Sequence, residues 1–205
     1  ASPVRRPHRC PAAENNGAAH FLEHLAFKGT KRRSQHELEI SIENMGMHLN
    51  AYTSREQTVY FAKCFKEDVG VAMDILSDIL LHSSLAPMAV ENERGVIVKE
   101  MEEVSKQHEE VIMDYLHEAA YTSSGLGMTI LGPESNIRGL KQQQFRDYID
   151  THYTAPRMVI CGAGAVNHDE LVDLAYVWHG DGSAEPFIAM ATNSNDIFIY
   201  DAASR

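Results

Sequence analysis

Cysteines and long apolar segments are scarce in this sequence. Its 205 residues include 3 cysteines, Cys10, Cys64 and Cys161, and no two of them share a close spacing. A disulfide framework and a CxxC metal site both need regularly spaced cysteines, so the sequence excludes both. No apolar run approaches the roughly 20 residues that a bilayer-spanning helix needs, and we therefore expect no membrane-spanning helix.

Basic residues are also few. The sequence has 18 Lys and Arg against 29 Asp and Glu, which gives a formal net charge of −11. Nucleic-acid binders carry a basic surface that neutralises phosphates, so this charge balance argues against nucleic acid as a partner. A basic peptide is the more suitable ligand for an acidic protein.

Residue patterns along the sequence predict many helices and few strands. Ser34 and Glu37 have the spacing of a capping box, and Pro87 fits the first turn of another helix. Two segments rich in β-branched and aromatic residues, 47–53 and 58–65, are joined by a short link that predicts a hairpin. Further helices are predicted over residues 16–27, 68–81, 109–121, 142–153 and 169–178, and further strands over 157–161 and 196–200. This pattern predicts an α+β fold, with a mixed sheet and packed helices.

The string His20-Phe21-Leu22-Glu23-His24 is the most informative motif. Residues four apart lie on one face of a helix, so His20 and His24 can direct two imidazoles to one point. The string is HxxEH, the inverted form of the zinc-protease helix motif. Chance gives about 0.05 such strings in a chain of this composition. The alternative is a pair of solvent-exposed histidines on a surface helix.

Each residue type of the motif suits zinc-dependent hydrolysis. Two neutral imidazoles and a third protein ligand bind Zn²⁺ and leave one position for water. The ion lowers the pKa of that water, and Glu23 is placed to take the proton as the general base.

Glu93 and Glu100 are candidates for the third ligand. They are seven residues apart and so lie on one face of a predicted helix. Many acids flank them, and spacing alone favours an ordinary solvated acidic face over a metal site.

Several motifs in order resemble the pitrilysin-type inverzincin peptidases. The first is the segment from Glu14 to Thr30, which contains the HxxEH string. It is followed by Glu43-Asn44-Met45-Gly46, by the segment from Leu49 to Thr58, by Glu93-Arg94-Gly95-Val96-Ile97 and by Ile130-Leu131-Gly132-Pro133. The resemblance covers residues 14–182 and implies the fold of the N-terminal half of a pitrilysin-type subunit. Residues 1–13, a basic segment, and residues 183–205 do not match it.

The resemblance implies a complete zinc site. In the family the third ligand is a glutamate 76 residues after the second histidine, and that position here is Glu100. Glu93 matches a supporting acid that orients the zinc ligands. The resemblance therefore implies one Zn²⁺ held by His20, His24 and Glu100.

The resemblance also implies how a substrate binds. The strand that contains Asn50 and Ala51 matches an edge strand that receives the substrate peptide by backbone hydrogen bonds. Phe27 matches the aromatic residue that receives the hydrophobic side chain after the scissile bond. Glu110 and Asp114 match the acids that hold an arginine just before that bond. The alternative interpretation of Glu110 and Asp114 is an ordinary solvated acidic face.

Taken as a whole, the resemblance implies a zinc metalloendopeptidase subunit that cleaves basic presequences from imported mitochondrial precursors. It implies a non-catalytic α-type partner subunit and a location in the mitochondrial matrix or at the matrix face of the inner membrane. Family subunits are roughly twice as long, so we expect a partial chain. Two alternatives remain, a non-catalytic core subunit of respiratory complex III and a bacterial-type peptidase with no targeting role.

Overall fold

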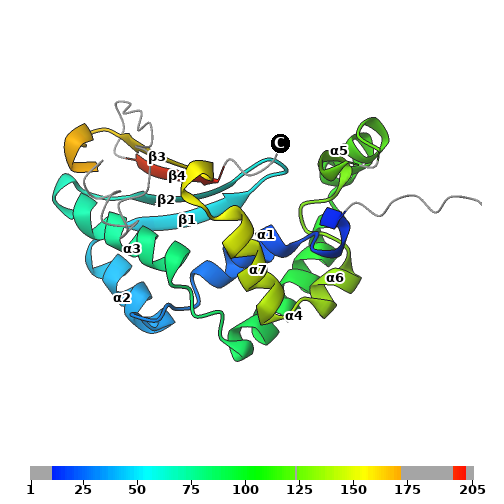
Figure 1. Ribbon diagram of the computed structural model, residues 1–205, viewed down its shortest axis with the longest axis horizontal. Helices are drawn as coiled ribbons and strands as arrows, with labels where there is room; N and C mark the ends of the chain where they lie inside the picture. Colours follow the sequence, from blue (N-terminus) through cyan, green and yellow to red (C-terminus); the bar gives the residue numbers. More distant parts are fainter. Residues whose placement is uncertain (1–10, 123, 172–195, 202–205) are drawn as a thin grey trace, which may run out of the picture.

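A computed structural model describes residues 11–122, 124–171 and 196–201 of the chain (Figure 1). The α-helices among these residues are α1 (Ala18–Ala26), α2 (Gln35–Asn44), α3 (Val69–Leu81), α4 (Pro87–Val104), α5 (His108–Ala120), α6 (Glu134–Gly139) and α7 (Gln142–His152). The strands are β1 (His48–Thr53), β2 (Thr58–Lys63), β3 (Met158–Ala163) and β4 (Asp196–Asp201). The α+β class is as predicted.

Local signals in the sequence account for most helix positions. The Ser34 hydroxyl accepts a hydrogen bond from the Glu37 backbone, and the Glu37 carboxylate accepts one from the Ser34 backbone, so the predicted capping box is present. Pro87 is the first residue of α4, as predicted. Helix α6 is a difference, because no helix was predicted over residues 134–139. Of the helix predicted over 169–178, the part beyond residue 171 lies outside the described residues.

The four strands form one sheet in the order β1-β2-β4-β3. The predicted hairpin is confirmed, with β1 and β2 paired from His48↔Lys63 to Thr53↔Thr58. Strand β4 comes from the segment that did not match the family, and it lies between β2 and β3. The prediction of a mixed sheet is wrong for the described strands, because all three pairings are antiparallel.

Two hydrophobic clusters meet at α1. The first lies between the sheet and α3, with Met73, Leu76 and Ile79 fully buried. The second is formed by α1, α4, α6 and α7. In α1, Ala26 belongs to the first cluster, whereas Phe21 belongs to the second. Because both of its ends are packed, α1 is a rigid support for the side chains that it carries.

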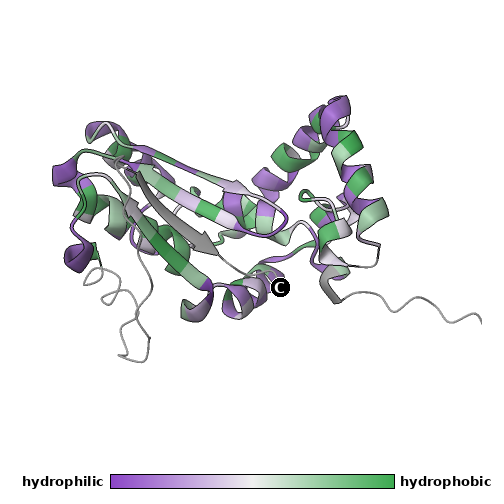
Figure 2. Ribbon diagram, turned by 90° about the horizontal axis from the view of Figure 1, so that it is seen from above, coloured by the Kyte–Doolittle hydropathy of each residue, from purple (hydrophilic) through white to green (hydrophobic). Residues whose placement is uncertain are grey.

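Helix α5 differs from the others because none of its residues is buried. It lies at the opposite end of the molecule from α2 and α3 (Figure 1). Colouring by hydropathy shows hydrophobic and hydrophilic residues mixed on the helices at this end (Figure 2). No helix among the described residues is long and apolar enough to cross a membrane.

Candidate metal centre

The start of α1 is held by a close backbone contact with the loop that precedes α6. Gly17 has φ +96° and Gly132 has φ +74°, and a Cβ on Gly132 would lie 2.8 Å from the Gly17 Cα. The Asn136 side chain adds hydrogen bonds to the carbonyl oxygens of Ala13, at 2.8 Å, and Asn16, at 3.1 Å. Only glycine permits both the left-handed backbone and the close approach. The helix that carries the HxxEH motif is therefore fixed at its first residue.

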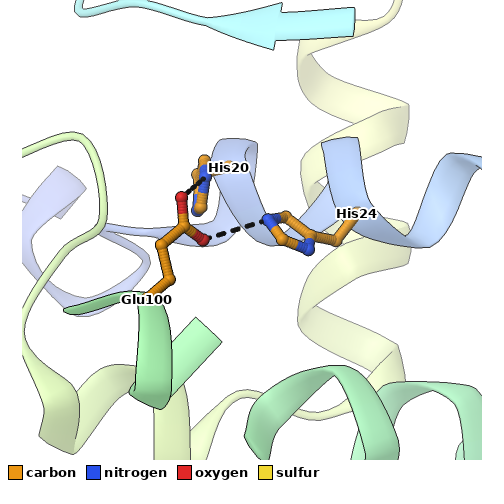
Figure 3. A group of neighbouring side chains, drawn as sticks. All are labelled: His20, His24 and Glu100. Atoms are coloured by element: carbon orange, nitrogen blue, oxygen red, sulfur yellow. Dashed lines mark ion pairs between the residues drawn. The ribbon is translucent and has the colours of Figure 1, made fainter. Parts of the chain in front are cut away.

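His20, His24 and Glu100 meet between α1 and α4 (Figure 3). His20 Nε2 lies 3.5 Å from Glu100 Oε1, and His24 Nε2 lies 3.3 Å from Glu100 Oε2. One potential ligand atom from each residue lies within 4.8 Å of the other two. The two short distances reach different oxygens of Glu100, so its carboxylate faces both imidazoles. Two histidines and one carboxylate are a ligand set that zinc accepts.

The environment of these three groups also fits a metal ion. Burial lowers the pKa of His20 below its ordinary value, although the Glu100 carboxylate acts in the opposite direction. A lowered pKa favours the neutral imidazole, which is the form that binds a metal. Glu100 Oε2 is a buried atom without a hydrogen-bond partner among the described residues. A buried carboxylate oxygen of this kind is well suited to accept a cation.

Glu23 lies beside this group without being part of it. Its Oε2 atom is buried and has no hydrogen-bond partner in the described part of the chain. A cavity of about 220 Å³ is lined by Glu23, His24, Phe27, Lys28 and Glu93. Glu23 thus lines a cavity and keeps one carboxylate oxygen free of partners among the described residues, and a general base needs an uncommitted carboxylate of this kind.

Glu93 contacts His24 at the ring nitrogen that does not contact Glu100. Its Oε2 lies 3.3 Å from His24 Nδ1, and its Oε1 lies 2.9 Å from Lys28 Nζ. When His24 is neutral and donates from Nδ1, its Nε2 presents a lone pair toward Glu100. This is the arrangement in which a carboxylate fixes the tautomer of a metal-binding histidine.

The predicted substrate-binding residues of β1 lie at the edge of the described sheet. Strand β1 packs against α1, and its described strand partner is β2. The Asn50 side chain accepts a hydrogen bond from the Ala51 backbone at 2.8 Å. Phe27 is half-buried at the end of α1 and lines the same cavity as Glu23. The substrate-binding roles of these residues stay predictions.

Glu110 and Asp114 lie one turn apart on α5. Glu110 is exposed, whereas the Asp114 carboxylate accepts a hydrogen bond from Arg55, in the link between β1 and β2. Asp114 therefore already holds one guanidinium, and a second would have to share its carboxylate. Their predicted role in binding arginine stays a prediction.

Sequence reasoning missed three cations that organise the site. Lys28 contacts Glu93, Arg55 contacts Asp114, and Arg94 donates to the carbonyl oxygens of Ile137 and Leu140 at the end of α6. All three lie inside or beside segments that carried the family resemblance. Their partners are 43 to 65 residues away, so spacing could not identify the pairs.

Comparison with known families gives two matches along the chain. Residues 8–134 match the insulinase family (peptidase family M16), and residues 139–181 match the domain described as the peptidase M16 inactive domain. The first match covers more than half of the chain.

The chain is also similar to individual proteins. It is 58% identical over 168 residues to the mitochondrial-processing peptidase subunit beta of Homo sapiens, which is 82% of this chain and 34% of that protein. It is 54% identical over 196 residues to the subunit of the same name from Blastocladiella emersonii, which is 93% of this chain and 42% of that protein. The chain thus spans well under half the length of these relatives.

A solved structure resembles the fold. The crystal structure of the periplasmic protease PqqL from Escherichia coli matches 85% of this chain and 21% of that chain, with a TM-score of 0.69 and 23% sequence identity. At this identity the likeness concerns the fold alone.

Proposed function

The chain belongs to the insulinase family of peptidases (peptidase family M16), and from this we propose that it is a zinc metalloendopeptidase subunit. Its substrates are basic N-terminal presequences of imported mitochondrial precursor proteins. The observation that carries the proposal is the convergence of His20, His24 and Glu100 beside Glu23, whose buried Oε2 atom has no hydrogen-bond partner within the described ranges. The names of the relatives support the mitochondrial role.

Each polar residue of the centre has a place in the proposed hydrolysis. His20, His24 and Glu100 would hold one Zn²⁺, which when bound would polarise the scissile carbonyl and acidify a water molecule. Glu23 would take a proton from the attacking water molecule and pass it to the leaving amine. Glu93 keeps the imidazole of His24 oriented through its Nδ1 atom.

The substrate peptide binds in extended form along β1. An edge strand offers unpaired backbone groups, which bind peptides of diverse sequence. Asn50 and Ala51 supply this edge, and Phe27 receives the hydrophobic side chain after the scissile bond. The Asn50 side chain occupies the Ala51 N–H, so a substrate strand that uses this donor displaces it.

The surrounding charge favours a basic substrate. The chain has a net charge of −11, and α5 carries Glu109, Glu110, Asp114 and Glu118 without a single Lys or Arg. Glu110 and Asp114 hold the arginine that precedes the scissile bond, with Arg55 sharing the Asp114 carboxylate. Charge-assisted hydrogen bonds make such a contact specific for a guanidinium.

We expect the enzyme to work in the mitochondrial matrix with a non-catalytic α-type partner subunit. The relatives are named as β subunits, which supports a partner of another kind. The complete His20, His24 and Glu100 set favours an enzyme over a scaffold subunit of complex III.

The variant Glu23→Gln tests this mechanism. We expect it to bind zinc like the wild type, because Glu23 is not a ligand, and to lose presequence cleavage by several orders of magnitude. The assay measures zinc content and cleavage of a basic presequence peptide with the partner subunit present. Glu43→Gln, an exposed change on α2, is the matched control and should behave as wild type. Loss of zinc in Glu23→Gln would make Glu23 a ligand and overturn the assignment.

A further inference from the structure

Lys28 is the second partner of the carboxylate that contacts His24. Glu93 is 7% exposed, so its charge is largely removed from water. Its two oxygens have different partners, with Lys28 Nζ at 2.9 Å from Oε1 and His24 Nδ1 at 3.3 Å from Oε2. A neutral imidazole alone is a weak partner for a buried carboxylate, and the full charge compensation comes from the ammonium.

The backbone around Lys28 is fixed on both sides. Its N–H donates to the Leu25 carbonyl at 3.1 Å, which closes the last turn of α1. The next residue, Gly29, has φ +103°, and its carbonyl accepts hydrogen bonds from the backbone and side chain of Ser84 at 3.1 and 3.0 Å. Lys28 is therefore presented to Glu93 by a fixed backbone segment just after the helix that carries His24.

We propose that Lys28 is a positioning residue of the metal centre. By binding one oxygen of Glu93, it directs the other oxygen to His24 Nδ1 and so fixes the tautomer in which Nε2 is free for the metal. The inference rests on the proposed zinc site, but it concerns a residue that is neither a ligand nor the general base. Without Lys28, the Glu93 carboxylate loses its charge compensation and turns toward solvent, and His24 loses its acceptor.

The first experiment measures zinc affinity of the purified chain by competition with a chelator. Partners of metal-bound histidines typically contribute about 10- to 100-fold in metal affinity. We expect Lys28→Met to weaken zinc binding by about 10-fold. Lys28→Arg keeps a cation and should restore most of the loss. Lys31→Met, an exposed change three residues away, is the matched control and should bind zinc like the wild type.

The second experiment determines the tautomer of His24 directly. In the zinc-free wild type, ¹⁵N NMR of the His24 ring should report a proton on Nδ1, whereas Lys28→Met should show a mixture of tautomers. If Lys28 had only a structural role, Lys28→Met would change the stability of the protein without changing the tautomer of the His24 ring. An unchanged His24 signal in Lys28→Met would overturn the proposal.

A double-mutant cycle shows whether Lys28 acts through Glu93. In a Glu93→Gln background, Lys28→Met should cause no further loss of zinc affinity, because the carboxylate that Lys28 positions is gone. Additive losses would overturn the proposal, as would unchanged or tighter zinc binding in Lys28→Met alone. A wild-type chain that binds no zinc would overturn the proposed function and this inference with it. A wild-type chain that binds zinc together with an unchanged Lys28→Met variant would overturn this inference alone, so the two failures are distinguishable.

Discussion

The contact between Gly132 and the start of α1 leads to a quantitative prediction for Gly132→Ala. Gly132 is buried with φ +74°, and an added Cβ would overlap the Asn16 carbonyl and lie 2.8 Å from the Gly17 Cα. The left-handed backbone costs a non-glycine residue about 1–2 kcal/mol. Forcing a methyl group against fixed backbone costs about 1–3 kcal/mol more. We therefore expect Gly132→Ala to lower the free energy of unfolding by about 2–5 kcal/mol.

Gly95→Ala is the matched control for this change. Gly95 lies inside α4, and a Cβ there would meet nothing within 4 Å. Replacing a helical glycine with alanine stabilises by about 0.5–1 kcal/mol. Urea denaturation of the wild type and both variants should therefore give shifts of opposite sign. If Gly132→Ala is as stable as the wild type, the backbone contact does not hold α1 in the way that we describe.

Two further predictions concern charge. The double variant Glu110→Gln with Asp114→Asn should weaken cleavage of an arginine-containing presequence, and it should barely affect the same peptide with alanine in place of that arginine. Equal losses on both peptides would indicate general destabilisation instead. Although burial alone would raise it, hydrogen bonds from Arg32 and Arg33 hold the pKa of Asp74 below its ordinary value. The stability that this shift provides is present above about pH 4 and is lost as the pH falls through the lower pKa of the folded state. Asp74→Asn should therefore flatten the decline of the urea midpoint below about pH 4.

The elements that the sequence predicted well are those with local causes. The capping box of Ser34, the proline at the start of α4 and the hairpin of β1 and β2 depend on residues within a few positions of one another. Helix α6 was missed because it has only six residues, too few for a periodic pattern. The strand over 196–200 was predicted, but its place between β2 and β3 depends on pairings that no local signal specifies.

The candidate site likewise combines residues that local spacing could identify with residues that it could not. His20 and His24 could be paired from the sequence because one helical turn joins them. Glu100 lies on another helix, and spacing alone favoured a solvated acid there, so the family resemblance was needed to select it. The contact of Lys28 with Glu93 had no signal at all, because an ion pair 65 residues apart in sequence depends on how α1 packs against α4.

The measurement that tests the central claim most directly is the zinc content of the purified chain and of its Glu100→Gln variant, each determined by elemental analysis after dialysis. We predict one zinc ion per wild-type chain, because His20, His24 and Glu100 present their ligand atoms within 4.8 Å of one another. Glu100→Gln removes the only carboxylate of that set and should retain far less zinc. A wild-type chain without zinc, or a variant that keeps a full equivalent, would contradict the assignment of this site.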